Sequence, residues 1–294
     1  MKNIVFDIQS VCPDREVTNF KISTLENRIC SSLEFSSEHR HEYFEIIWIK
    51  SGKGLHHIDM VEHPYNGSVL FVLTPGQIHK IVEESESTGY VVKFLPSIFK
   101  HEGDFESYIL DTCLFDNTST CPVIPVPLDG TMRSRLDNSF SQMVEEFHRP
   151  DLDSENILSA HLKILITYIH RMKRLKLGRE VSISDAQYGL FRSFKVAIEK
   201  SFRKDHSVQF YASKLSTQAR TLNKVSRKYA GKSASEMIQE RLLLEAQRNL
   251  FHESKSVKEI GFDLGFDDPA YFTRFFKKHI GLAPQYFKEK AALS

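Results

Sequence analysis

The stretch VKEIGFDLGFDDPAYFTRFFKKHIGLAPQYF, residues 257–287, most constrains the fold because it specifies two short helices and the turn between them. Ser256 opens an S-x-x-E pattern, the capping box that begins many helices. Gly265 interrupts the helical pattern after two turns, since glycine adopts the positive φ that tight turns need. Asp268, followed by proline, then predicts the start of a second helix that runs to about His279.

The second of these helices is apolar on one face and basic on the other. Its polar face carries Thr273, Arg274, Lys277 and Lys278. A helix of this kind can lie in the major groove of DNA, where lysine and arginine neutralise phosphates and side chains near its start reach base edges. The pattern therefore predicts a helix-turn-helix unit.

This segment resembles the C-terminal signature of the AraC/XylS family of bacterial transcription regulators. The positions that carry the resemblance are Ile260, Gly265, Phe266, Asp268, Tyr271, Phe272, Arg274, Phe276, Lys277, Lys278, Gly281, Pro284 and Tyr286. Gly261 stands where the family usually has alanine, which is expected to cost some helix stability without changing the fold.

Residues 211–250 resemble the family's other helix-turn-helix, which lies about fifty residues upstream. The matching positions are Ala212, Leu215, Leu222, Lys228, Gly231, Arg241, Leu242, Ala246 and Leu250. The first recognition helix is predicted over 218–229 and departs from the pattern twice. Gln218 replaces a usual serine, with Thr217 as another N-cap candidate, and Ser226 replaces a usual phenylalanine.

The resemblance implies which side chains of the two recognition helices meet DNA. In the first helix, Arg220, Asn223 and Lys224 would face bases, since arginine suits guanine and asparagine suits adenine. Arg227 and Lys228 would contact phosphates. In the second helix the predicted contacts are Ala270, Tyr271, Thr273, Arg274, Lys277 and Lys278. The helix predicted over 234–251 would hold the two recognition helices about 34 Å apart on one face of the DNA duplex.

The charge distribution agrees with a polyanion partner for the C-terminal third only. Residues 187–294 contain 20 Lys+Arg and 11 Asp+Glu, whereas the remainder contains 19 and 27. A basic segment beside an acidic one indicates that nucleic acid meets the C-terminal part.

The N-terminal part has the pattern of a β domain. The short apolar runs EIIWI, GLHHID, SVLFVL and YVVKF predict strands, and SGKG, PYNG and TPG predict turns between them. CPVIPVPL (121–128) predicts the exit, because its prolines disfavour a central strand. The expected fold is two-domain α+β: a cupin-like N-terminal β-barrel with flanking helices, and an all-α C-terminal domain with two helix-turn-helix motifs.

Helices predicted over 132–147 and 154–175 follow the barrel. The second has an apolar stripe wide enough to cover the barrel and to meet a second copy, so a homodimer is expected. Residues 1–176 are thus predicted as the effector-binding and dimerisation domain, with the barrel to about 128 and helices over 131–176. The polar stretch 177–187 is predicted as a linker, and 188–294 as the DNA-binding domain.

The sequence HRHEYFE (39–45) has the spacing of metal ligands. Residues 39–79 resemble the cupin-like sensor domain of AraC-type regulators, and the resemblance implies that His39, His41, Glu45 and His79 converge inside the barrel. Such a set suits a divalent metal such as Fe, Mn, Ni or Zn. The alternative, which the family resemblance favours, is a pocket whose histidines bind an organic effector or only hydrogen-bond. The predicted pocket comprises His39, His41, Glu45, Trp48, His56, Ile58, Phe71 and His79; no cofactor is required and no catalytic residue is predicted.

These patterns predict a cytoplasmic, nucleoid-associated bacterial regulator that binds double-stranded DNA. The effector would be a small molecule such as a sugar, and the family resemblance implies activation through RNA polymerase. No membrane partner or signal peptide is expected, because no long apolar run is present and Asp7 precedes any apolar run. Two alternatives stay open: a cupin metalloenzyme fused to a DNA-binding module, and a ligand-independent regulator whose barrel only dimerises.

Overall fold

The computed structural model describes residues 5–8, 19–26, 37–99, 114–115, 123–127, 130–176 and 186–292. The chain divides into two compact units, Ile4–Glu180 and Val181–Ser294. The first is rich in strands and the second is helical, which confirms the predicted fold class. Most of the predicted linker, residues 177–185, lies outside the described residues, so its bounds stay a prediction.

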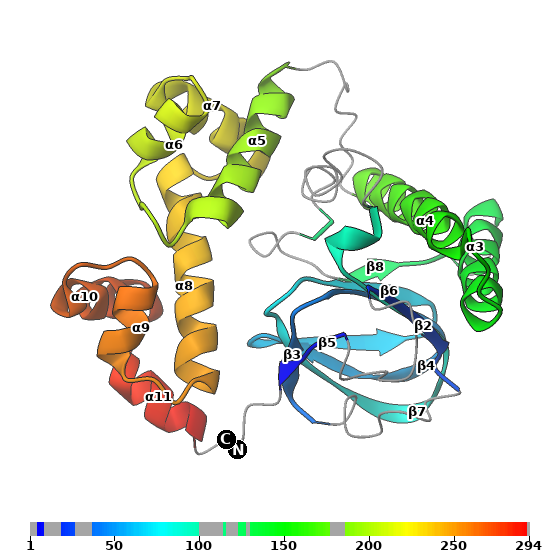
Figure 1. The fold of residues 1–294 in the computed structure, drawn as a ribbon. Coiled ribbons are helices and arrows are strands. Elements are labelled where there is room, and N and C mark those ends of the chain that lie inside the picture. Colours follow the sequence, from blue (N-terminus) through cyan, green and yellow to red (C-terminus); the bar gives the residue numbers. More distant parts are fainter. Residues whose placement is uncertain are drawn as a thin grey trace. The chain divides into compact units, whose positions relative to one another are not determined.

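Within the part of the N-terminal unit that the structure describes, eight strands form one bent sheet (Figure 1). The strands are β1 (Val5–Phe6), β2 (Phe20–Thr24), β3 (His39–His41), β4 (Phe44–Ile58), β5 (Val61–Asn66), β6 (Val69–Leu73), β7 (Ile78–Phe94) and β8 (Val123–Pro125). They are ordered β1-β3-β7-β4-β6-β8, with β2 also on β7 and β5 also on β4. All pairs are antiparallel except β1 with β3. The proline-containing β8 is an edge strand, as its composition requires.

Two long strands, β4 and β7, run alongside each other and allow the sheet to bend. Their register shifts between Ile49 and Gly54, and Gly52 there has φ of 137°. SGKG (51–54) is therefore a bulge within β4, and its prediction as a turn is wrong. The prediction fails because glycine serves a bulge as well as a turn. PYNG is likewise mostly strand: Pro64 to Asn66 lie in β5, and the chain turns at Gly67.

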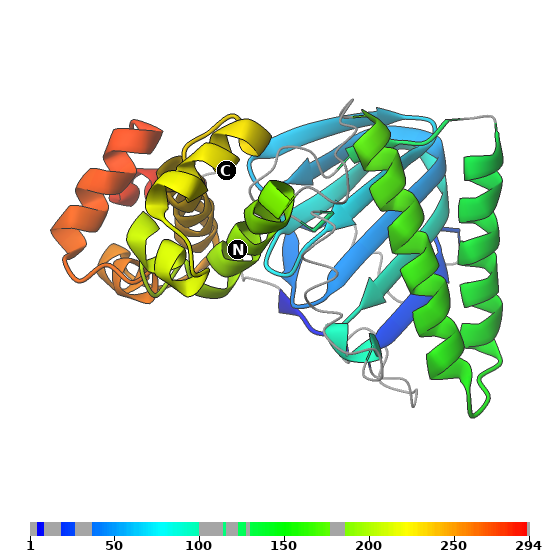
Figure 2. The same ribbon diagram turned by 90° about the horizontal axis from the view of Figure 1, so that it is seen from above.

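Two helices cover one face of this sheet, α3 (Thr131–His148) and α4 (Ser154–Lys176). Figure 2 shows them side by side across the strands. A core of buried side chains from both helices and from β2, β4, β6 and β7 joins the two layers. The 3-10 helix η1 (Pro96–Phe99) contributes Ile98 and Phe99 to this core. A separate apolar cluster, which includes Ile47, Ile58 and Phe71, fills the other face of the sheet, inside the bend.

The C-terminal unit consists of short helices arranged along one longer helix, α8 (Figure 1). The helices are α5 (Ala186–Ser201), α6 (Val208–Lys214), α7 (Ala219–Ala230), α8 (Ala234–His252), α9 (Val257–Asp263), α10 (Pro269–Ile280) and α11 (Pro284–Ala292). The pairs α6–α7 and α9–α10 have the order of helix-turn-helix units. Among the described helices of the chain, none is both long and apolar enough to cross a membrane.

The predicted helix ends of the C-terminal unit follow local hydrogen bonds. The predicted capping box at Ser256 forms, and Ser233 makes a second one at the start of α8. The Asp268 side chain accepts a hydrogen bond from the backbone N–H of Ala270. Gly231 and Gly281 end α7 and α10 in the left-handed conformation. The exception is the start of α7, where the N-cap is residue 218 rather than 217 and no side chain caps the helix.

One buried hydroxyl in α7 leads to a stability prediction. Ser226 is completely buried, and its Oγ has no hydrogen-bond partner among the residues that the structure describes. We expect Ser226→Ala to raise the free energy of unfolding by about 1 kcal/mol, because it removes an unsatisfied polar group. Urea denaturation checks this. Ser139→Ala is the matched control, since this buried serine in α3 donates to the carbonyl of Arg135 at 2.9 Å and gains nothing from the change.

Candidate functional site

The first candidate DNA-contacting surface is the exposed side of α7. Leu222, Val225 and Tyr229 bury the opposite side in the domain core. Arg220, Lys224, Arg227 and Lys228 are exposed, as a role at a DNA interface requires. The Lys228 ammonium group donates to the side chain of Gln187 at 2.9 Å, which directs it toward the start of α5.

Asn223 is less available for bases than the sequence predicts. Its amide nitrogen donates to the carbonyl of Ala219 at 3.1 Å, and its amide oxygen accepts from the backbone N–H of Ala234 at 3.1 Å. Both ends of the side chain are thus occupied in joining α7 to the start of α8. The structure gives Asn223 a role in positioning the first recognition helix, and its contact with adenine stays a prediction.

The second candidate surface is the exposed side of α10. Phe272, Phe275 and Phe276 bury its other side. Ala270, Tyr271, Arg274, Lys277 and Lys278 are exposed, and an exposed ion pair of 3.5 Å links Arg274 to Asp268. Thr273 is half-buried, and its hydroxyl donates to the carbonyl of Pro269 at 2.9 Å.

The turn of the second unit packs directly on the turn between α5 and α6. The Nε2 atom of His206 lies 2.9 Å from the carbonyl oxygen of Leu264, and the His206 ring contacts Phe266 with centroids 4.6 Å apart. At Gly265, whose φ is +83°, a Cβ atom would lie 2.1 Å from the carbonyl oxygen of Arg203. This contact joins the two helix-turn-helix units in addition to α8, so it helps to fix their relative orientation.

A buried ion-pair network strengthens the same region. The Arg241 guanidinium donates to Glu199 at 2.9 Å and to Glu245 at 2.9 Å, and it lies 4.0 Å from the centre of the Phe202 ring. Arg203 also pairs with Glu245. Burial by itself would raise the pKa of Glu245, but the surrounding guanidinium groups, Arg241 foremost, outweigh it and lower that pKa to about 2. The carboxylate is therefore ionised at neutral pH.

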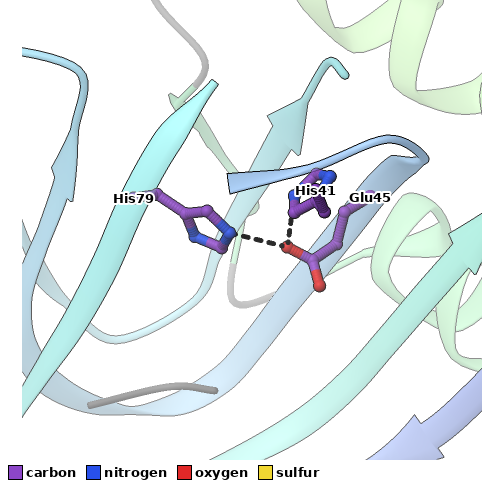
Figure 3. A group of neighbouring side chains, drawn as sticks. All are labelled: His41, Glu45 and His79. Carbon is purple, nitrogen blue, oxygen red and sulfur yellow. Dashed lines mark ion pairs between the residues drawn. The ribbon is translucent and has the colours of Figure 1, made fainter. Parts of the chain in front are cut away.

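The N-terminal unit contains a buried polar cluster on the inner face of the bent sheet, formed by His41, Glu45 and His79 (Figure 3). One ligand-type atom of each residue lies within 4.8 Å of the others. Glu45 Oε2 is 3.5 Å from Nε2 of His41 and 3.5 Å from Nε2 of His79. The strands β3, β4 and β7 each supply one of the three, so the bend of the sheet brings them together.

The other predicted pocket residues fall into two groups. His56, Ile58 and Phe71 lie on the same inner face: the His56 ring meets Phe71 with centroids 4.4 Å apart, and its Nε2 is 3.1 Å from Nδ1 of His79. Trp48 does not belong to this face. It packs against Phe140 of α3, with ring centroids 5.5 Å apart, because strand alternation places it opposite Glu45 and Ile47. The prediction of Trp48 as a pocket wall is therefore wrong.

His39 lies beside the cluster without contributing an atom to it. It is buried, its ring centroid is 4.3 Å from that of His79, and its Nδ1 lies 2.9 Å from the carbonyl oxygen of Ser37. Lys93, which sequence patterns missed, is buried on β7 with Nζ 3.8 Å from Glu45 Oε1. A single lysine within the apolar run YVVKF was the available signal, since buried lysines are rare without a partner.

Two histidines of this region, His79 and His56, are held neutral. Burial lowers the pKa of His79 well below its usual value, and the positive potential of His39, His41 and His56 adds to this effect. The pKa of His56 is lowered in the same way, first by burial and then by His63. Neutral imidazoles are the form that accepts hydrogen bonds or binds metals.

Two family models match the chain. A helix-turn-helix domain covers residues 211–290, and an AraC-like ligand binding domain covers residues 30–162. The first span contains both candidate DNA-contacting helices, and the second contains the His41–Glu45–His79 cluster.

Relatives of known designation match over most of the chain. The HTH-type transcriptional activator RhaR of Enterobacter sp. (strain 638) is 19% identical over 256 residues, 87% of this chain and 88% of that protein. The activator RhaS of Mannheimia succiniciproducens is 23% identical and spans 86% of this chain and 89% of its own. Among solved structures, ToxT from Vibrio cholerae is 14% identical over 92% of this chain and 98% of that chain, with a TM-score of 0.43. From its ligand-binding and helix-turn-helix domains, this chain belongs to the AraC family of transcription regulators.

Proposed function

We propose that this regulator activates transcription and that a small molecule bound inside the N-terminal sheet controls its DNA binding. The main support for ligand control is the cluster of His41, Glu45 and His79. It contains buried polar atoms that lack hydrogen-bond partners within the described parts of the chain. Such atoms are costly in a domain that only folds, whereas a bound ligand satisfies them. By population-shift reasoning, the ligand must prefer one arrangement of the protein over another.

A homodimer is part of this proposal. Ile157 and Ile164 lie seven residues apart on α4 and are 40% and 44% exposed. Residues at this spacing share one helix face, and an exposed apolar face can be covered by the same face of a second copy. Contact with RNA polymerase is proposed from the family resemblance, as is the bacterial setting.

A thermal-shift screen of the full chain against sugars and aromatic compounds tests the ligand. A rise in the unfolding temperature, together with a change in DNA affinity, supports ligand control. Intact DNA binding with no stabilising compound would favour a regulator whose N-terminal domain only dimerises. Genome-wide footprinting identifies the target genes, and their products indicate the effector class. Turnover of a substrate by metal-loaded protein would instead support the alternative of a metalloenzyme joined to a DNA-binding module.

DNA recognition by α10 can be tested at one side chain. We expect Arg274→Ala to weaken binding to the footprinted site by about 1–3 kcal/mol, because an exposed arginine on a recognition helix can bond the edge of guanine. Fluorescence anisotropy at fixed salt measures the change. Arg171→Ala, at an exposed position on α4, is the matched control and should leave the affinity unchanged. Equal affinities for the Arg274 variant and the control would contradict a base-reading role.

A further inference from the structure

We infer that the N-terminal domain binds one divalent transition-metal ion through His41 Nε2, Glu45 Oε2 and His79 Nε2. These three side chains leave buried polar atoms without a hydrogen-bond partner among the described residues. The inference rests on the proposed function in one respect: the ion, alone or with an organic molecule bound to it, is what the sensor domain detects.

The backbone determines which nitrogen of His41 faces the cluster as an acceptor. Nδ1 of His41 lies 2.7 Å from the carbonyl oxygen of Tyr43, and a carbonyl only accepts, so Nδ1 carries the proton. In the neutral ring, Nε2 then has a lone pair and no hydrogen. This lone pair lies 3.5 Å from the carboxylate oxygen Oε2 of Glu45, which is also an acceptor. In this neutral form, two buried acceptors face each other with no proton between them.

His56 allows His79 to present a lone pair in the same direction. Nδ1 of His79 and Nε2 of His56 are 3.1 Å apart, so one of the two nitrogens donates to the other. When His79 donates, its Nε2 is a bare acceptor 3.5 Å from Glu45 Oε2. A metal-bound histidine commonly donates its other N–H to a nearby acceptor, which orients the ring. His56 is then a positioning residue for His79.

The two oxygens of Glu45 face different partners, one a lysine and the other a pair of imidazoles. Oε1 faces the buried ammonium group of Lys93 at 3.8 Å, and Oε2 faces the two imidazoles. Oε2 and the Nε2 atoms of His41 and His79 are all buried, and none has a hydrogen-bond partner among the described residues. Lys93 balances the charge of Glu45. A divalent ion would therefore add net positive charge to the site, and a negatively charged small molecule bound to the ion would offset that charge.

The donor set and the spacing both fit a metal ion. Two imidazoles and one carboxylate suit zinc, iron or nickel better than magnesium or calcium, which prefer oxygen ligands. Two ligand atoms about 2.1 Å from a tetrahedral ion lie about 3.4 Å apart. Both separations involving Glu45 Oε2 are 3.5 Å. Three protein ligands leave a coordination position for a further molecule, as a sensor needs.

The full-length chain, stripped with EDTA, tests this inference by titration calorimetry with Zn²⁺ and, separately, Mg²⁺. We expect one Zn²⁺ per chain, a higher unfolding temperature with Zn²⁺, and no response to Mg²⁺. Glu45→Gln and His79→Gln remove a metal ligand, so each should lower Zn²⁺ affinity by more than about a hundredfold. His56→Gln removes only a residue that hydrogen-bonds to a ligand, so it should lower Zn²⁺ affinity about 10–100-fold. Circular dichroism in EDTA verifies that each variant folds.

Two matched variants separate this site from other histidines. His57→Gln changes a neighbouring histidine of β4 that faces Glu62 instead, and should keep full affinity. His39→Gln should also keep it, although the H-x-H spacing alone includes His39. Loss of binding in the His39 variant would overturn the three-residue assignment. Absence of stoichiometric Zn²⁺ on folded wild-type protein, or equal affinity in the Glu45 and His79 variants, would overturn the metal site. Neither result would affect DNA binding measured without metal, so failure here is distinguishable from failure of the regulator proposal.

Discussion

Replacing Gly265 with alanine is expected to lower the free energy of unfolding of the C-terminal domain by about 3–5 kcal/mol, at the upper end of single-residue effects. Two costs combine at this position. The left-handed φ of +83° costs a residue with a Cβ about 1–2 kcal/mol. In addition, the new Cβ would lie 2.1 Å from the backbone carbonyl oxygen of Arg203, so the turn between α5 and α6 must move away.

Gly231 and Gly281 are matched controls for the first cost alone. Their φ values are +72° and +83°, and a Cβ at either position meets no atom within 4 Å. Alanine there should cost only about 1–2 kcal/mol. Urea denaturation of the full chain, with hydrogen exchange over residues 257–292, compares the three variants. If all three lose the same stability, the contact between Gly265 and Arg203 has no energetic importance. A larger loss at Gly265 should also weaken DNA binding, because the contact helps to orient the two recognition helices.

The second large effect is expected at Glu245. Glu245→Gln keeps the shape of the side chain and removes its charge, which leaves the buried Arg241 with Glu199 as its remaining carboxylate partner in the network. Removing one member of a buried ion pair typically costs about 3–5 kcal/mol, because the remaining charge is desolvated without full compensation. Urea denaturation measures the loss. Glu240→Gln is the matched control: its pair with Lys232 is exposed, and such pairs contribute at most about 1 kcal/mol.

The same carboxylate predicts how stability depends on pH. Its folded-state pKa of about 2 lies below the value of about 4.3 that glutamate has in an unfolded chain. Its contribution is therefore fully present above about pH 4.3 and is lost as the pH falls through the folded-state value. Thermal unfolding of the wild type between pH 5 and pH 3 should show this loss, and Glu245→Gln should show a smaller one. Parallel pH profiles would exclude Glu245 as a source of the acid sensitivity.

The C-terminal half of the fold was predictable because its signals are local. The serines at positions 233 and 256, and Asp268, bond backbone groups two or three residues away, so their spacing in the sequence already contains the geometry. The exposure of the basic face of α10 was also predictable locally, because the phenylalanines on the opposite face of the helix must be buried. The hydrogen bonding of Asn223 was not predictable in this way, because its partner Ala234 lies on another helix.

The composition of the N-terminal site could not be predicted fully from local sequence signals. Alternation along β4 separates Glu45 from Trp48, but it does not say which face lies inside the bend, so Trp48 was assigned to the wrong side. The H-x-H spacing made His39 and His41 equivalent, and only the folded structure distinguishes them, because it brings Nε2 of His41 within 3.5 Å of Glu45 on β4.

The sequence by itself determined the two-domain organisation, the helix-turn-helix units and the residue types of a metal or effector site, because these depend on composition and short-range spacing. The tertiary structure alone decided that His41, Glu45 and His79 form one buried cluster, with Lys93 facing the other oxygen of Glu45. It also decided that the backbone of Gly265 lies close to the carbonyl group of Arg203. Those arrangements arise from strands and turns distant in sequence, which only the packing of the folded chain brings within contact distance.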